Sequence, residues 1–210
     1  MLALTVASLA ACTWLMGGAA TATDRLSLLT AWVCLVLLAS TVGLGPWQAL
    51  RSGRPMVNNS LRRDIGIWAA ITGLLHLGIA TAQVMQPAYF SAYITGSPAA
   101  PLPDWAGWVG NSGIVGGYVV GLIVLALLVL SNDWSLHQLG IDRWKRLQRG
   151  ATNAFFATVA HGAAFQVIER RVSGWLPALL VVATAIIVLR RRARGAVAAR
   201  ALSSGDDFGS

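Results

Sequence analysis

Two histidines lie in the middle of long apolar segments. His76 stands in the run ITGLLHLGIA, and His161 stands in FFATVAHGAAF. About twelve residues separate Asp64 from His76 and Arg149 from His161, so at about 1.5 Å per helical residue both imidazoles lie about 18 Å from the same end of their helices. A polar group inside such a segment is costly and is usually retained for function. Two imidazoles at equal depth can face each other across a gap between two helices.

A heme fits such a gap, because its iron takes one axial nitrogen from each side. No open position is then left on the iron, which suits electron transfer more than oxygen chemistry. We therefore predict one heme with His76 and His161 as its metal ligands. The other ring nitrogen of each histidine needs an acceptor, either a backbone carbonyl or a Ser or Thr hydroxyl. The alternative, two unrelated imidazoles that bond to neighbouring helices, stays open.

Small residues surround both histidines and leave room for a flat macrocycle. Gly73 and Gly78 bracket His76, and we count Gly73 among the cofactor-binding residues. A glycine stripe at helical spacing lies between the two segments and indicates either close helix packing alone or packing that also clears a heme edge. The stripe consists of Gly110, Gly113, Gly117 and Gly121, with Gly116 beside it.

The composition places these segments in a membrane. The chain has 210 residues, of which 56% are hydrophobic and 11% charged, with a mean hydropathy of +0.63. A membrane-spanning helix needs about 20 mostly apolar residues. Six runs qualify, at about 2–20, 27–46, 65–86, 109–131, 151–168 and 174–190. We expect an all-α integral membrane protein, a six-transmembrane-helix bundle that forms one domain over 1–201, with a polar, disordered tail at 202–210.

The net charge of +8 is distributed as a topology signal. Most Lys and Arg residues follow the second, fourth and sixth spans, which places both termini on the cytoplasmic side. No base-reading motif is present, so we exclude nucleic acid as a partner. The third histidine, His137, lies in one of these charged segments and is interpreted as an interfacial loop residue. Tryptophans near the span ends are interpreted as membrane anchors, among them Trp144.

The first span has two alternative interpretations as a targeting signal. The residues LAAC at 9–12 resemble a lipoprotein cleavage box, and TATD resembles a signal-peptide site. No basic residue precedes this run, so we expect a retained helix. Cys12 and Cys34 have no metal-site spacing and are not expected to form a disulfide.

Two segments resemble the ferric-reductase-like transmembrane domain family. They are NNSLRRDIGIWAAITGLLHLGIA (58–80) and SNDWSLHQLGIDRWKRLQRGATNAFFATVAHGAAFQ (131–166). Within that superfamily the chain is most similar to the heme-binding membrane subunits of periplasmic methionine sulfoxide reductases, and STEAP metalloreductases and NADPH oxidase cores are related. The resemblance implies a b-type heme in a six-helix core of a bacterial cytoplasmic membrane, with axial ligands at His76 and His161. The family often has a further histidine where this chain has Gln148. NADPH oxidase cores hold two hemes with four membrane histidines, and this chain has only two in the middle of spans, so one heme is the limit.

The resemblance implies a membrane b-type cytochrome, an electron-transfer subunit of an oxidoreductase rather than a complete enzyme. The sequence has no nucleotide- or flavin-binding motif, so electrons must come from a quinol or a cytoplasmic flavin reductase and pass to an outer-side acceptor. A redox partner protein or larger membrane complex is implied, and quinone or flavin is a further candidate cofactor. Basic residues of the inner rim are candidates to contact heme propionates, quinone oxygens or an acidic partner. They include Arg63, Arg146 and Arg149.

Two other function classes remain. One is a non-redox structural or assembly subunit of a larger membrane complex that keeps this fold. The other is a small-molecule transporter, which is disfavoured because none of the eight Asp and Glu residues lies in the middle of a span.

Overall fold

The computed structural model describes residues 21–52, 59–90, 104–168 and 175–205, and every regular element in these ranges is a helix. The predicted first span, 2–20, and the last residues of the predicted tail lie outside this part. The described helices are α2 (Ala22–Ser52), α3 (Asn59–Val84), α4 (Pro87–Phe90), α5 (Asp104–Val129), α6 (Asp133–Gln148), α7 (Gly150–Ile168) and α8 (Trp175–Gly205). Helix α8 continues past residue 201, where the sequence predicted the domain to end.

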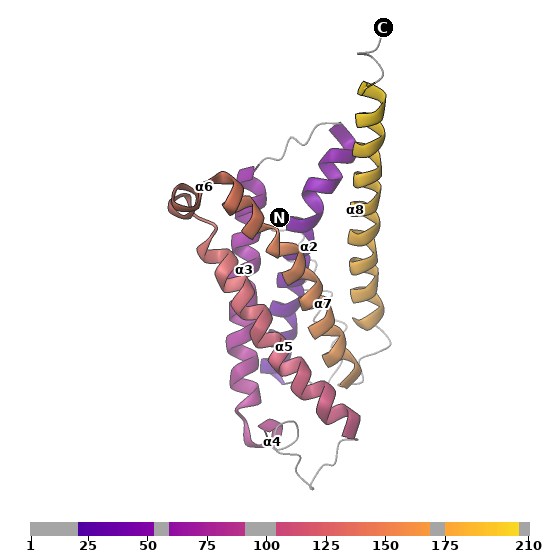
Figure 1. Cartoon of the computed structure of the whole chain (residues 1–210). Coiled ribbons are helices and arrows are strands. Elements are labelled where there is room, and N and C mark those ends of the chain that lie inside the picture. The colour runs from indigo at the N-terminus through magenta and orange to yellow at the C-terminus, as the bar shows by residue number, and fades with distance from the viewer. Residues whose placement is uncertain (1–20, 53–58, 91–103, 169–174, 206–210) are drawn as a thin grey trace.

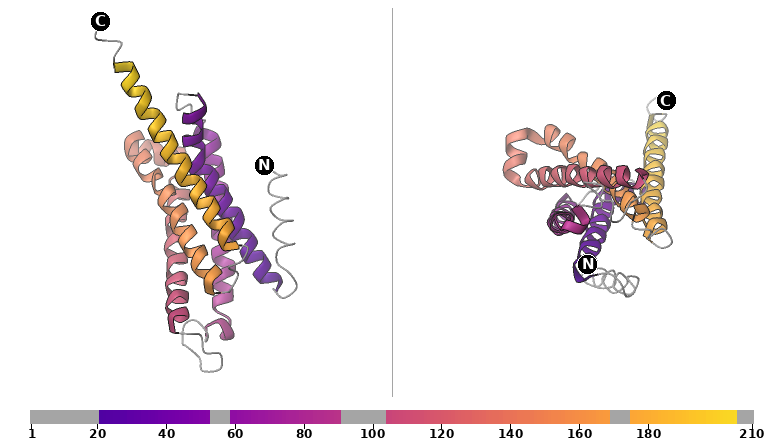
Figure 2. Two further views of the ribbon diagram at one scale, coloured as in Figure 1. Left: turned by 90° about the vertical axis from the view of Figure 1, so that its right-hand side faces the viewer. Right: turned by 90° about the horizontal axis from the view of Figure 1, so that it is seen from below.

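Five long helices run side by side as a bundle (Figures 1 and 2). Helix α2 packs against α3, α7 and α8, and α5 packs against α3 and α7. Within the described residues, no Cα atom of α3 lies within 8 Å of a Cα atom of α7. The core lies along α2, where Leu35, Leu38 and Val42 are buried, and it includes Phe155 of α7. The two histidine-bearing helices are therefore held apart by α2 and α5.

The bundle has the features of a membrane protein. In the described part, three helical segments are long and apolar enough to cross a membrane: Ala22–Arg51, Leu61–Val84 and Gly107–Val129. Apolar side chains such as Leu122 and Val181 are 66% and 67% exposed, as a lipid-facing surface requires. Helices α7 and α8 also coincide with predicted spans, but α7 carries Asn153 and Gln166, and the apolar part of α8 ends at Arg190.

The segment that follows α5 was expected to be a loop, and this expectation was wrong. Residues 133–148 form helix α6, at the end of the bundle where α2 ends and α3 begins (Figure 1). The helix is broken at Gly140, whose φ of 69° and ψ of 158° are accessible mainly to glycine. This break hides the helical pattern in the sequence. His137 is exposed on the first half of α6, so its predicted loop setting was wrong, and its interfacial position stays a prediction.

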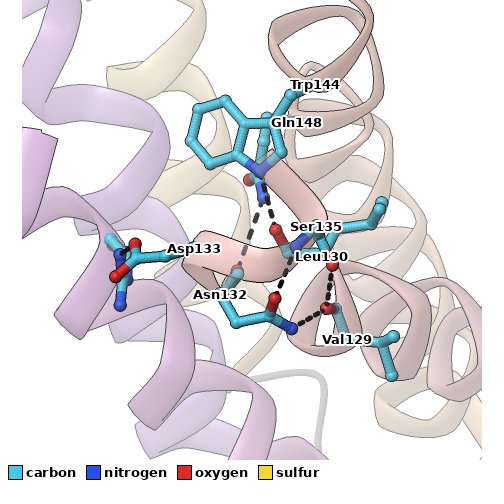
Figure 3. A network of polar contacts seen from close by, with 9 residues as sticks. Val129, Leu130, Asn132, Asp133, Ser135, Trp144 and Gln148 are labelled. Carbon is cyan, nitrogen blue, oxygen red and sulfur yellow. Dashed lines mark hydrogen bonds and ion pairs between the residues drawn. The ribbon is translucent and has the colours of Figure 1, made fainter. Parts of the chain in front are cut away.

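Polar side chains join the end of α5 to both halves of α6 (Figure 3). Asn132 is the N-cap of α6: its side chain accepts a hydrogen bond from the Ser135 backbone at 2.7 Å and donates one to the Val129 carbonyl at 2.6 Å. Trp144 Nε1 donates to the Leu130 carbonyl at 2.7 Å. Trp144 thus caps the end of α5, and its role as a membrane anchor stays a prediction.

Gln148 belongs to the same network. Its Nε2 lies 3.4 Å from the Ser131 hydroxyl, which itself donates to the Leu127 carbonyl at 2.7 Å. Arg63 at the start of α3 forms an ion pair with Asp133, which attaches α6 to α3. In this chain, the S-N-x-x-S and Trp residues of the second resembling segment therefore stabilise the α5–α6 corner.

Candidate functional site

A mostly apolar cavity of about 180 Å³ lies between α2, α3, α5 and α7. On α3 its lining runs from Gly73 to Val84, a length of about 16 Å at 1.5 Å per residue. Leu28 and Leu35 of α2 and Val120 of α5 supply much of the apolar wall. The cavity occupies the space that separates the two histidine-bearing helices.

Both mid-helix histidines line this cavity, His76 from α3 and His161 from α7. Their ring centroids are 6.3 Å apart, and the ring planes are inclined at 71°. Two imidazoles bonded at about 2.0–2.1 Å to opposite sides of one metal ion have centroids roughly 6–6.5 Å apart. The same separation also lies within the range of an edge-to-face ring pair. The structure thus brings together the two residues that the sequence singled out, at a spacing that suits a shared metal.

Backbone carbonyls determine which ring nitrogen of each histidine carries the hydrogen. His76 Nδ1 lies 2.9 Å from the carbonyl oxygen of Ser27 and 3.4 Å from its hydroxyl, and His161 Nδ1 lies 2.8 Å from the carbonyl oxygen of Gly113. A carbonyl oxygen only accepts, so each Nδ1 must carry the hydrogen. Nε2 then keeps its lone pair, and neither Nε2 is hydrogen-bonded within the described residues. Metal-binding histidines commonly show this arrangement.

The glycines of α5 allow this helix to approach α7 and α3 closely. A Cβ atom at Gly117 would lie 2.6 Å from Cε1 of His161, and one at Gly121 would lie 2.7 Å from a methyl of Leu77. A Cβ at Gly113 would meet the ring of Phe165 at 3.0 Å. The stripe therefore serves close packing, and Gly117 and Gly121 also line the cavity.

Gly73, the third predicted cofactor residue in this region, lines the cavity together with the histidines. A Cβ atom there would lie 3.0 Å from Sγ of Cys34, which is buried and lines the cavity from α2. Glycine at this position lets α3 pack directly against the thiol.

The predicted basic residues lie elsewhere. Arg63 is about 20 Å from His76 along α3 and pairs with Asp133. Arg146 and Arg149 line a second hollow, next to α8. None of these three arginines lines the histidine cavity.

Polar residues that the sequence did not single out complete the cavity. Gln83 Nε2 donates to Asp24 Oδ1 at 2.6 Å and joins the end of α3 to the start of α2. Gln166 is buried, and its Oε1 has no hydrogen-bond partner in the described structure. All three residues line the cavity. The only signal in the sequence was that Gln166 is an uncharged polar residue in an apolar run.

Among the described residues, no group of three or more His, Cys, Asp or Glu side chains is placed to hold a metal ion. The histidine pair alone is thus too small a ligand set for a bare ion. Comparisons of the chain with protein-family models, curated proteins and solved structures gave no match. The assignment of function therefore depends on the chain's own residues.

Proposed function

We propose that this chain is a membrane b-type cytochrome. It relays electrons from a quinol or a cytoplasmic flavin reductase, through one heme held by two histidines, to an acceptor on the outer side of the membrane. The observation that carries the proposal is the pair of imidazoles that line one cavity at a centroid distance of 6.3 Å, each with Nδ1 committed to a carbonyl.

The donor set fits heme iron. His76 and His161 would each supply a neutral Nε2 lone pair, and a porphyrin brings the other four ligands that the described side chains do not provide. When bound, the heme supplies one-electron oxidation and reduction. No described residue other than the two histidines is required as a ligand.

The size of the cavity sets a further condition. A cavity of about 150 Å³ holds a molecule the size of benzene, so a porphyrin needs more room than the 180 Å³ enclosed here. Room for a porphyrin would therefore require that lining side chains, of which Leu77 is one, move aside. Leu77 covers Gly121 in the structure, so its displacement would expose a flat stretch of α5.

The remaining residues of the cavity have distinct roles in this proposal. The apolar wall excludes water from the metal ligands. The carbonyls of Ser27 and Gly113 orient the rings and increase the basicity of Nε2. Gln166 offers an unpaired acceptor for a hydroxyl or a protonated carboxyl group of a bound molecule. The Asp24–Gln83 pair closes the end of the cavity away from α6.

The membrane arrangement is part of the proposal. We infer a six-helix bundle in a bacterial cytoplasmic membrane with both termini inside, as a subunit that works with a redox partner protein or a larger complex. The support is the basic end of the bundle, to which α2, α3, α6 and α8 all contribute arginines. Arg63, Arg146 and Arg149 belong to this end, so we assign them to topology and partner contact and not to the heme.

The absorption spectrum tests the proposal. The chain is expressed with ample heme and purified in detergent, and a dithionite-reduced minus oxidised spectrum is recorded. We expect the bands of a low-spin b heme, which disappear in His76→Ala and in His161→Ala. The matched control is His137→Ala, because His137 is exposed on α6 and should leave the bands unchanged.

A rescue experiment separates ligation from folding. His161→Gly opens a space in the cavity wall that added imidazole can occupy, so the low-spin bands should return with imidazole if Nε2 is the ligand. Protein that stays colourless with ample heme, or that keeps its low-spin bands in both alanine variants, would refute the proposal. Colourless, folded protein would instead favour the non-redox structural subunit.

A further inference from the structure

A second hollow, of about 580 Å³, lies at the basic end of the bundle, where α6, α7 and α8 meet. Two arginines come from the end of α6, Arg146 and Arg149, and two from α8, Arg190 and Arg194. Between them lie Thr152 and Asn153, in the first turn of α7. Three separate helices therefore direct polar groups to one place.

The charge in this hollow is not balanced by the protein. Its lining contains no Asp or Glu, and within the described residues none of the four arginines forms a salt bridge. Arg190 is half-buried, donates to the Thr152 hydroxyl at 2.9 Å and lies close enough to Arg62 and Arg194 to be repelled by them. Like charges held near one another repel, and an anion bound between them would relieve this repulsion.

The need to orient the protein in the membrane does not explain why these four arginines lie together. Orientation in the membrane requires only that basic residues lie on one side. Exposed arginines that meet this need without lining the hollow are present nearby, such as Arg143, Arg191 and Arg192. The convergence of four guanidinium groups on one hollow therefore needs a separate reason.

We propose that this hollow binds a phosphate group. Guanidinium groups pair with phosphate oxygens through two parallel hydrogen bonds, and the positive end of α7, which begins at Gly150, adds to the attraction. The apolar part of α8 ends directly before Arg190, so the hollow lies at the height of lipid headgroups if α8 crosses the membrane. An anionic phospholipid is thus the expected source of the phosphate, and a soluble phosphate compound is the other source. This inference does not depend on heme.

Matched double variants test the site. R190Q/R194Q removes two charges from the hollow, and R191Q/R192Q removes two charges from positions on the same helix that do not line it. R146Q/R149Q and R143Q/K145Q form the same comparison on α6. Each pair keeps the net charge equal, so a general loss of electrostatic attraction affects both members alike.

The full-length protein is delipidated in detergent, and two ligands are titrated. Native mass spectrometry compares phosphatidylglycerol with phosphatidylcholine of the same acyl chains, and calorimetry measures pyrophosphate. We expect phosphatidylglycerol to be preferred, with its binding weakened about tenfold or more in the hollow variants and unchanged in the controls. Loss of pyrophosphate binding in the same variants, without a lipid preference, would assign the site to a soluble phosphate.

Two results would overturn the inference. One is equal weakening in the hollow variants and their controls. The other is the absence of any preference for phosphatidylglycerol over phosphatidylcholine together with no binding of pyrophosphate. If R190Q/R194Q fails to fold because the bond to Thr152 is lost, the α6 pair still decides the question.

Discussion

Nδ1 of His161 lies 2.8 Å from the carbonyl oxygen of Gly113, so an imidazole on α7 is oriented by the backbone of α5. The same helix approaches the ring again one turn later, at Gly117. The position of α5 therefore controls both the orientation of the ring and the space around it. Substitutions on α5 that leave the histidine intact should still disturb the site.

Gly117→Ala should disturb the site, whereas Gly116→Ala should not. A Cβ at 117 would lie 2.6 Å from His161 Cε1, while a Cβ at 116 meets nothing within 4 Å. Overpacking of this kind costs about 1–3 kcal/mol, and Ala at 116 gains helix propensity. Thermal denaturation in detergent should show a lower midpoint for Gly117→Ala alone. Equal midpoints for the two variants would contradict the close approach of α5 to the ring.

Gly73→Ala should destabilise the protein through Cys34. A Cβ at 73 would lie 3.0 Å from the buried Cys34 Sγ, so either the thiol or α3 must move. We expect a loss of about 1 kcal/mol or more that Cys34→Ala partly restores in the double variant. Gly78→Ala is the control, because a Cβ there has open space. A double-mutant cycle of unfolding free energies that shows no coupling would count against this contact.

The α5–α6 corner should depend on its cap. Asn132→Ala removes the acceptor for the Ser135 backbone, and the loss of an N-cap costs about 1 kcal/mol. Trp144→Phe keeps an aromatic ring but leaves the Leu130 carbonyl without its donor, at a similar cost. His137→Ala, exposed on the same helix, should be neutral. Hydrogen exchange of the α6 amides would locate the effect, and unchanged protection in Asn132→Ala would argue against it.

The Arg63–Asp133 ion pair should contribute little to stability. The two side chains are 38% and 73% exposed, and exposed pairs are typically worth about 0.2–1 kcal/mol. A double-mutant cycle with Arg63→Gln and Asp133→Asn should give a coupling energy below about 1 kcal/mol that falls as salt is added. A larger coupling that resists salt would show that this pair fixes α6 more firmly than its exposure indicates.

The two central residues of the site could be predicted from the sequence, because a polar residue inside an apolar segment is costly and is usually retained for function. His76 and His161 were singled out by their cost in an apolar segment, and their equal depth predicted that they could meet. Their partners were out of reach of sequence analysis: every residue has a carbonyl, so nothing marks Ser27 or Gly113 as an acceptor. Only the three-dimensional arrangement of α2 and α5 selects them.

The role of the basic residues, in contrast, could not be predicted from the sequence. Arg146 and Arg149 were named as candidates to contact heme propionates, quinone oxygens or an acidic partner because they belong to the basic inner rim, but charge in a membrane protein also sets orientation. Their shared hollow with α8 joins residues more than forty positions apart, a proximity that no local pattern encodes. Helix α6 was missed for a local reason, since the positive φ at Gly140 interrupts the helical repeat.

Both acceptors for the histidines are backbone atoms, and this affects how the site can change. A side-chain replacement at 27 or 113 removes neither carbonyl, although a Cβ at 113 would press on Phe165. Inserting one residue upstream in α2 or α5 turns each carbonyl by about 100° about the helix axis. The orientation of the two rings is thus set by helix register more than by residue identity. Insertions and deletions, rather than point substitutions, are the changes that would abolish it.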